Sequence, residues 1–253
     1  MRYIIIIIFF WPNILFSQDK ARNYGGQKEK KRMFEQELYY APGSLNKYYG
    51  GKVELEFDLD ENAQISNIQV LKSVSKELNE EAIRLLKLML WIPAQENGQA
   101  VKSHESISFM FNPKKYKQIC NRRGYELKKP DLDFTFKVYR EKDLSSMPGF
   151  RGKEKNFQNY VKENLQYPEA ALKYNAQGIV EIQFVVEPSG RLTNIHLAEK
   201  LEANCDIVAK ELILRSKWRP GNINGLPVRT LMSRKIYFSP KGKQPFISIP
   251  EKE

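Results

Sequence analysis

The feature that most constrains this fold is an internal repeat. Residues 24–113 recur without a gap 127 positions later, so identical residues fall in register along both copies. The matched pairs include Gly51 with Gly178, Glu54 with Glu181, Phe57 with Phe184, Asn67 with Asn194, Trp91 with Trp218, Pro93 with Pro220, Gly98 with Gly225 and Phe111 with Phe238. A unit of this length is too long for a solenoid, so the repeat predicts two tandem small domains of one fold.

Each copy contains a strongly alternating strand. Residues 53–59 and 180–186 carry apolar side chains at every second position, with mostly polar side chains between them. This alternation is typical of a sheet that is covered on one face and wet on the other. After a turn, a second strand breaks its alternation between Ile65 and Ile68, and in the same place in the second copy, which predicts a shared β-bulge.

An amphipathic helix follows the second strand in each copy. Its apolar stripe comprises Leu78, Ala82, Leu85 and Met89 in the first copy, and Cys205, Ala209, Leu212 and Ile213 in the second. Three residues then mark the end of the helix and a turn, namely Trp91, Pro93 and Gly98, matched by Trp218, Pro220 and Gly225. A third strand is predicted at 101–111 and at 228–238. The predicted fold class is α+β, with each domain a helix followed by ββαβ around a three-stranded antiparallel sheet.

The chain divides into five predicted segments. These are a signal peptide (1–17), a first domain (24–113), a basic linker (114–146), a second domain (147–240) and a flexible tail (241–253). Residues 19–32 are polar and are interpreted as a tether before a short lead-in helix at Met33–Leu38. Within the linker, residues 134–139 alternate like an extra edge strand.

The first residues have the layout of a secretory signal. A positive start at Arg2 precedes an almost wholly apolar run, and the small Ser17 precedes a polar stretch. The run is shorter than the roughly 20 residues that a membrane-spanning helix needs, and Pro12 interrupts it. We therefore favour a cleaved signal over a retained inner-membrane anchor, and expect the folded part outside the cytoplasm.

The net charge of +11 invites a nucleic-acid hypothesis. Export argues against it, and so do the strand aromatics Phe57 and Phe184, which lie on the face predicted to be buried and cannot stack on bases. A basic exported protein suits acidic envelope polymers or a protein partner better. Two cysteines are too few to staple the chain, and a disulfide between Cys120 and Cys205 is left open.

No residue pattern predicts catalysis. Ser103, His104 and Glu105 are the residue types of a catalytic triad, but neighbours on a strand point to opposite faces and cannot hydrogen-bond in series. Neither His104 nor His196 has further ligands at metal-site spacing. The glycine pairs Gly25-Gly26 and Gly50-Gly51 lack the lysine and the helix start that a phosphate-binding loop needs. We therefore predict no catalytic residue, no metal site, no cofactor and no enzymatic activity.

The second copy carries a series of motifs in a specific order over residues 147–240. These are Tyr167-Pro168, Gly178, Ser189-Gly190, Trp218-Arg219-Pro220, Asn224-Gly225 and Phe238. Together they resemble the C-terminal domain of the TonB family of energy transducers, in its Bacteroidetes-type form. The first copy resembles it more distantly, since Tyr40-Ala41-Pro42 only approximates the Tyr-Pro step. The motif residues are expected to hold the fold.

The resemblance implies a periplasmic domain of a Gram-negative cell that binds the short N-terminal box of outer-membrane TonB-dependent receptors. In this family the box adds as an extended strand beside the third strand of the sheet, and main-chain hydrogen bonds supply the affinity. The predicted peptide-binding residues are Val228, Arg229, Thr230, Leu231, Met232, Ser233 and Arg234. The alternative is an edge merely blunted by Arg229, Arg234 and Lys235.

The implied function is protein binding within TonB-dependent transmembrane transport across the outer membrane. Inner-membrane motor proteins would be partners only if the N-terminus is an anchor, and the long proline-rich spacer of a complete transducer is missing. A second hypothesis is a structural envelope module that binds peptidoglycan or another acidic polymer without energy transduction. The receptor, its cargo, a homodimer and ligand binding by the first copy stay open.

Overall fold

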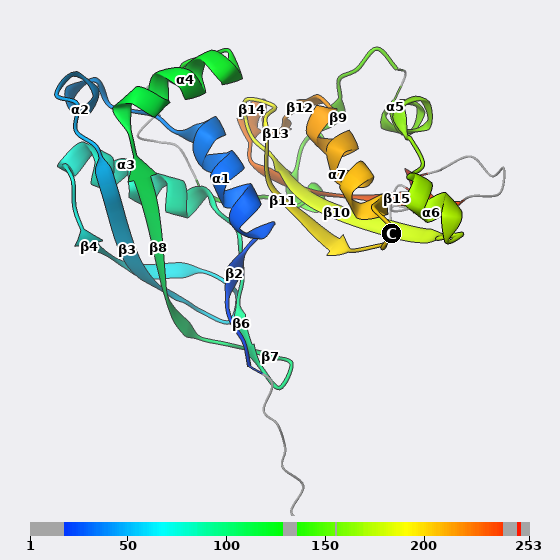
Figure 1. Cartoon of the computed structure of the whole chain (residues 1–253), viewed down its shortest axis with the longest axis horizontal. Helices are drawn as coiled ribbons and strands as arrows, with labels where there is room; N and C mark the ends of the chain where they lie inside the picture. Colours follow the sequence, from blue (N-terminus) through cyan, green and yellow to red (C-terminus); the bar gives the residue numbers. More distant parts are fainter. Residues whose placement is uncertain (1–17, 129–135, 155, 240–246, 249–253) are drawn as a thin grey trace, which may run out of the picture.

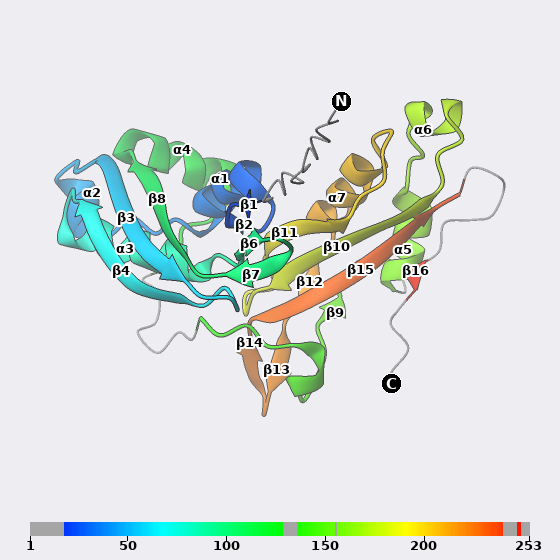
Figure 2. The same cartoon turned by 90° about the horizontal axis from the view of Figure 1, so that it is seen from below.

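The computed structural model describes residues 18–128, 136–154, 156–239 and 247–248. The predicted signal peptide and most of the tail lie outside these residues. Two lobes lie side by side, and each is built on an antiparallel sheet whose helices gather on one side (Figures 1 and 2). The α+β class and the tandem arrangement are confirmed.

The first sheet has the order β4–β3–β8, and the second has the order β11–β10–β15–β16. The strands of the first are β3 (Gly51–Leu59), β4 (Ile65–Lys72) and β8 (Ser103–Phe111), and those of the second are β10 (Gly178–Val186), β11 (Leu192–Glu199), β15 (Thr230–Phe238) and the short β16 (Ile247–Ser248). The crossover helices are α3 (Lys76–Leu88) and α7 (Cys205–Arg215). In each domain the helix brings the third strand beside the first, as the ββαβ pattern predicts.

The predicted bulge is confirmed in both copies. The register shifts between Glu56 and Asp58 in β3, and between Gln183 and Val185 in β10. Asn67 and Asn194, on the strands opposite, have φ angles of 51° and 54°. Asparagine tolerates this left-handed conformation better than most residues, which accounts for the same residue at both bulges.

Short ladders join each crossover helix to the third strand. They are β5 (Trp91–Ile92), β6 (Ala94–Glu96) and β7 (Gln99–Val101) in the first domain, and β12 (Trp218–Arg219), β13 (Gly221–Ile223) and β14 (Leu226–Val228) in the second. β6 and β7 form a hairpin, as do β13 and β14, around Asn-Gly turns whose residues all have positive φ. Such Asn-Gly turns match the twist of the strands they join. The predicted continuous third strand is therefore split in both copies, after Val101 and after Val228.

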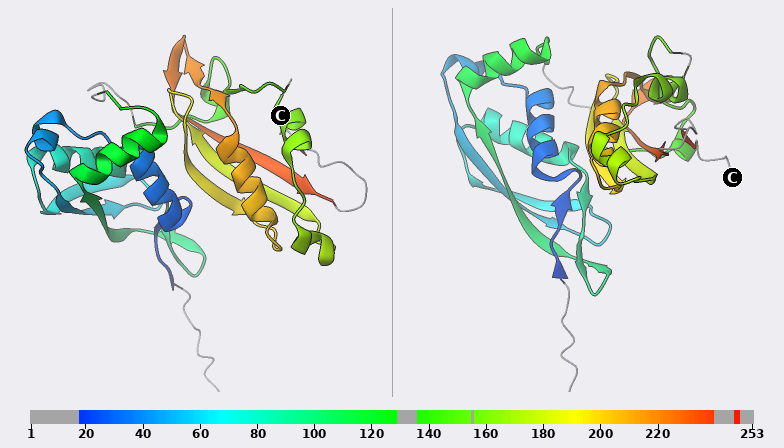
Figure 3. Two further views of the ribbon diagram at one scale, coloured as in Figure 1. Left: turned by 45° about the horizontal axis from the view of Figure 1, so that its top comes forward. Right: turned by 45° about the vertical axis from the view of Figure 1, so that its right-hand side comes forward.

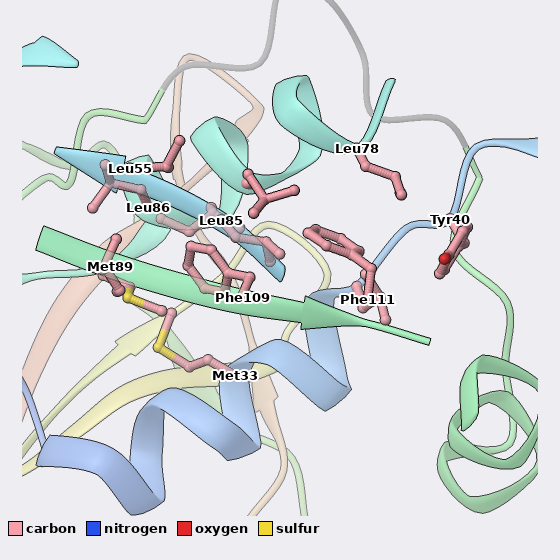
Figure 4. Packing of buried hydrophobic residues seen from close by; sticks show 14 of the residues in the cluster. Met33, Tyr40, Leu55, Leu78, Leu85, Leu86, Met89, Phe109 and Phe111 are labelled. Carbon is pink, nitrogen blue, oxygen red and sulfur yellow. The ribbon is translucent and has the colours of Figure 1, made fainter. Parts of the chain in front are cut away.

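The first core lies between the sheet and the helices. Val53, Leu55 and Phe57 of β3 have no exposed surface, and α3 packs on them with Leu78, Leu85 and Leu86 (Figure 4).

Each domain also has a tyrosine whose hydroxyl donates to the main-chain carbonyl oxygen of the residue nine positions later in the sequence. Tyr40 donates to Tyr49 across α2 (Pro42–Asn46), and Tyr167 donates to Ala176 across α6 (Glu169–Lys173).

One segment that was predicted to be loose is ordered. Residues 19–32 do not form a tether, because β1 (Gln18–Asp19) pairs with β6, β2 (Arg22–Asn23) pairs with β5, and α1 (Gly26–Glu37) buries Met33 in the first core. Polar residues cover the exposed side of α1, which hid its buried side from a reading of composition. In the second domain, β9 (Gly149–Phe150) pairs with β12, and α5 (Phe157–Asn164) takes the place of α1.

The predicted linker begins with a helix, α4 (Pro113–Arg123). The Asn112 side chain caps it by accepting from the backbone N–H groups of Lys114 and Lys115 at 3.0 and 3.1 Å. Its lysines face solvent, while Tyr116, Ile119 and Cys120 share one side and enter the first core. Cys120 and Cys205 are both buried and free, in different cores. The remaining described linker contains one 3₁₀ turn, η1 (Glu141–Asp143).

Candidate functional site

The outer edge of β15 is the place where strand addition was predicted. Its inner edge pairs with β10 along its whole length, from Gly178 opposite Phe238 to Val186 opposite Thr230. On the outer side, the Tyr139 N–H donates to Arg229 O at 2.9 Å, and the Leu231 N–H donates to Tyr139 O at 2.9 Å. The linker therefore does supply an edge contact, and this contact corrects the expectation of a free border at Val228–Leu231.

The far end of the same edge also has a neighbour. β16 pairs antiparallel with β15 at Lys235 and Ile236. Among the described residues, no strand lies beside Met232–Arg234, between these two contacts. Along a strand, the main-chain N–H and C=O groups of every second residue point to the same edge. The N–H and C=O of Ser233 therefore point away from β10, as those of Leu231 do. The Ser233 carbonyl already accepts from Arg234 Nη1 at 2.6 Å, which leaves its N–H as the outward donor.

Arg229 has a different role from the two that its sequence position suggested. Its side chain is 1% exposed and forms two hydrogen bonds with the carboxylate of Glu187, at 2.9 and 3.0 Å. It also donates to the carbonyl oxygens of Leu88 and Phe136, both at 2.8 Å. The Arg229 side chain is thus not an exposed edge charge, and it ties the second domain to the first and to the linker.

The other predicted site residues divide between the core and the open face. Thr230 and Met232 are buried, while Ser233 is half-buried and donates to Glu181 Oε1 at 2.6 Å. Arg234 lies over the ring of Trp218 at 5.3 Å and 3.6 Å from Glu141, and burial lowers its pKa although Glu141 opposes that change.

The opposite edge of the second sheet, β11, is closed by the first domain. Glu29 of α1 accepts from the Ile195 N–H at 3.0 Å, and Arg32 donates to Leu192 O at 2.8 Å. The Asn194 side chain donates to Leu88 O at 3.0 Å and accepts from the Leu90 N–H at 2.7 Å. Figure 3 shows α1 beside the second lobe. The first domain therefore satisfies main-chain groups that an edge strand would leave open.

Sequence reasoning missed this interface, although the comparison of the two copies holds a signal. Arg229 and Glu187 align with Lys102 and Asp60 of the first copy, which are exposed or half-exposed. The signal is a position that is charged in both copies but is arginine in only one of them, opposite a position that is acidic in both.

In the first domain the outer edges of β4 and β8 have no paired strand among the described residues.

The residues considered for catalysis do not form a triad. His104 Nδ1 lies 2.7 Å from Asp58 Oδ1, and its Nε2 lies 3.4 Å from Glu56. Ser103 Oγ is buried without a hydrogen-bond partner and so is not activated by His104. Within the ranges that the structure describes, no group of three His, Cys, Asp or Glu residues could hold a metal ion.

The pKa values of the two histidines are shifted in opposite directions. Hydrogen bonds to Asp58 and Glu56 raise the pKa of His104, whereas burial lowers that of His196, helped by the nearby Arg22. Protonation of His104 thus favours the folded state in acid, and this small contribution is lost as the pH rises through its raised pKa. His196 acts oppositely, because the folded state loses stability as the pH falls below about 6.5.

An NMR titration of the ring protons checks this prediction, with the His104→Gln and His196→Gln variants assigning the two signals. His104 should titrate above the ordinary value and His196 below it. Arg22 belongs to the first domain, so Arg22→Gln should return the His196 pKa part of the way toward its ordinary value. Two histidines with the same midpoint would contradict the described surroundings.

The fold defines a class of tandem small α+β domains. The model for the Gram-negative bacterial TonB protein C-terminal matches residues 36–113 and 163–240, and the chain belongs to this family. It is therefore a TonB-like protein of TonB-dependent transport, in a family of the cell envelope that interacts with outer-membrane receptors. A comparison with curated proteins finds no match. None of the described helices has the length and apolar content needed to cross a membrane.

Proposed function

We propose that this protein binds the N-terminal box of an outer-membrane receptor by strand addition, in the periplasm, as a step of TonB-dependent transport. The family match supports the partner class. The observation that carries the mode of binding is the gap on the outer edge of β15 beside Met232–Arg234, where the Ser233 N–H points away from β10. An incoming strand could accept this hydrogen bond.

A longer incoming strand would replace one of the two short contacts that flank the gap. Tyr139 makes two main-chain hydrogen bonds to this edge, and β16 pairs with two residues. Each hydrogen bond stabilises by only about 0.5–1.5 kcal/mol net, so a peptide that pairs along most of β15 would offset the loss of either contact. The binding segment that we propose is therefore Val228–Arg234. Ser233 supplies its open main-chain donor, and the first half of the segment becomes available when Tyr139 is displaced.

The test is an NMR titration with a receptor box peptide, following the backbone amides of both third strands. Shifts at 228–238 would support the proposal. Shifts only at 101–111 would move the site to β8 of the first copy. If neither strand responds and cell-wall sacculi bind the protein in a salt-dependent way, the second hypothesis, an envelope module for acidic polymers, is correct.

A proline at position 233 should weaken peptide binding at least tenfold. Proline lacks the N–H that would donate to the incoming strand, and at an outward-facing position it leaves the hydrogen bonds between β15 and β10 in place. The Ser233→Ala variant is the matched control, because it removes the hydroxyl that donates to Glu181 but keeps the N–H. Isothermal titration calorimetry measures both. Equal weakening by alanine and proline would show that the main-chain donor is not used.

A further inference from the structure

Residues of both domains line a basic cleft. Two of the elements that contribute to it, α4 and β9, lie on the side of the molecule away from the β6–β7 hairpin (Figure 1). The cleft has a volume of about 1150 Å³. The first domain contributes α1 and α4, and the second contributes residues 150–154, 189–192 and 214–218. Eight of its lining residues are Arg or Lys, whereas two are Glu. The cleft therefore concentrates positive charge where two low-dielectric walls face each other.

Two arginines, one from each domain, are held in fixed positions at the cleft. Arg123 donates to three carbonyl oxygens at the end of α1, those of Glu35, Gln36 and Leu38, at 3.0–3.2 Å. Across from it, Arg191 binds both carboxylate oxygens of Glu37 at 2.8 Å. The guanidinium groups of Arg123 and Arg191 lie 4.9 and 5.2 Å from the Tyr125 ring centroid. These arginines are preorganised, and one already binds a carboxylate from the chain itself.

Five cations of the second domain line the cleft. Arg191 and Arg215 pair with Glu37 and Glu211, and the other three have no ion pair among the described residues. These three are Arg151, Lys153 and Lys217, and all of them are exposed. The Arg151 N–H donates to Lys217 O at 2.7 Å, so the backbones of these two residues lie side by side. Three exposed cations face the single carboxylate of Glu154 in this part of the cleft, so positive charge is in excess and an anionic ligand would reduce it.

The chemistry of the walls favours carboxylates over sugar or base rings. Trp218 and Tyr160, which line the cleft, are only 4% and 8% exposed, so their faces cannot stack on a ring. The Tyr125 ring is already in contact with two arginines. The volume also exceeds that of most small-molecule pockets, about 300–1,000 Å³, so the cleft suits an extended chain.

We propose that this cleft binds an acidic protein segment, an extended run of Asp and Glu side chains, held by Arg151, Lys153 and Lys217 and directed by the fixed guanidinium groups of Arg123 and Arg191. The site does not use the edge of β15, so it is independent of the proposed receptor-box function. Attraction between the cleft and an acidic partner would speed their association at low salt. The partner would dissociate at high salt, because the exposed cations are screened.

The experiment measures fluorescence anisotropy of a labelled ten-residue glutamate peptide with the full-length chain, against a Gly-Ser peptide of equal length. The test variant is Arg151→Ser/Lys153→Ser/Lys217→Ser. The control, Lys72→Ser/Lys76→Ser/Lys102→Ser, removes the same charge from exposed positions of the first domain. We expect the glutamate peptide to bind, the test variant to weaken it about tenfold, as the loss of three exposed ion pairs predicts, and the control to change it less than about twofold.

Two results would overturn the proposal. Equal weakening by both triple variants would mean that only net charge matters, and failure of the glutamate peptide to bind at low salt would exclude the ligand class. If isolated sacculi bind in dependence on the same three cations while the peptide does not, the ligand is a polysaccharide and not a protein segment. Titration of the test variant with the receptor box peptide keeps the two sites apart, since that binding should be unchanged.

Discussion

Replacing Trp218 with alanine is expected to unfold the second domain. Trp218 is 4% exposed, and its ring centroid lies 5.3–6.0 Å from those of Phe150, Phe157 and Phe184. Its Nε1–H donates to Ser216 Oγ at 2.8 Å, so the substitution also leaves a buried hydroxyl without its donor. The expected loss is about 3–5 kcal/mol, against a total of about 5–15 kcal/mol for a folded domain.

Urea denaturation followed by circular dichroism measures this loss. The matched substitution in the first copy, Trp91→Ala, should cost less. Trp91 lies 5.0 Å from the ring of Phe57, and its Nε1–H has no hydrogen-bond partner among the described residues. An unchanged second transition in Trp218→Ala would show that the assigned core is wrong.

Replacing Arg229 with methionine should destabilise the protein by about 3–5 kcal/mol, because the substitution leaves Glu187 as an unpaired charge that is 4% exposed. The same change removes the hydrogen bonds to Leu88 O and Phe136 O, so the domains should also separate more readily. Denaturation gives the stability, and small-angle scattering gives the association of the domains.

The double variant Arg229→Met/Glu187→Leu separates the two contributions. With both charges removed, no unpaired carboxylate stays buried, and the double variant should be more stable than Arg229→Met alone. Lys102→Met, at the exposed counterpart in the first copy, should change stability by no more than about 0.5 kcal/mol. Strictly additive losses from the two single variants would show that Arg229 and Glu187 do not interact.

Much of each domain follows from local sequence pattern. Alternation along 53–59 and 180–186 predicts the central strands, and the shared break in the next strand predicts the bulge that appears beside Asn67 and Asn194. The helices α3 and α7 end at Leu88 and Arg215, a few residues before the prolines that forbid their continuation, and the predicted closing residues Trp91 and Trp218 begin short strands instead. The predictions of the strands and the bulge succeed because one buried face imposes a short period on the sequence, and the repeat confirms each feature twice.

The charged helices were harder to predict. In α1 and α4, lysines and arginines outnumber the apolar residues that face the core, so composition suggested a tether and a linker. The buried stripe of α4 is short, with Tyr116, Ile119 and Cys120 at i, i+3 and i+4. A helix with so few buried positions depends on tertiary packing more than on its own periodicity, and a reading by composition underestimates it.

The sequence by itself determined the repeat, the order of elements in each domain and the family. Only the tertiary structure decided which strand edges stay open. Closure of β11 depends on Glu29 meeting the Ile195 N–H, and the join between the domains depends on Arg229 meeting Leu88, contacts that span 166 and 141 residues. Hydrogen bonds of this kind leave no periodic trace, because a side chain and a distant main-chain group meet only once both domains have folded.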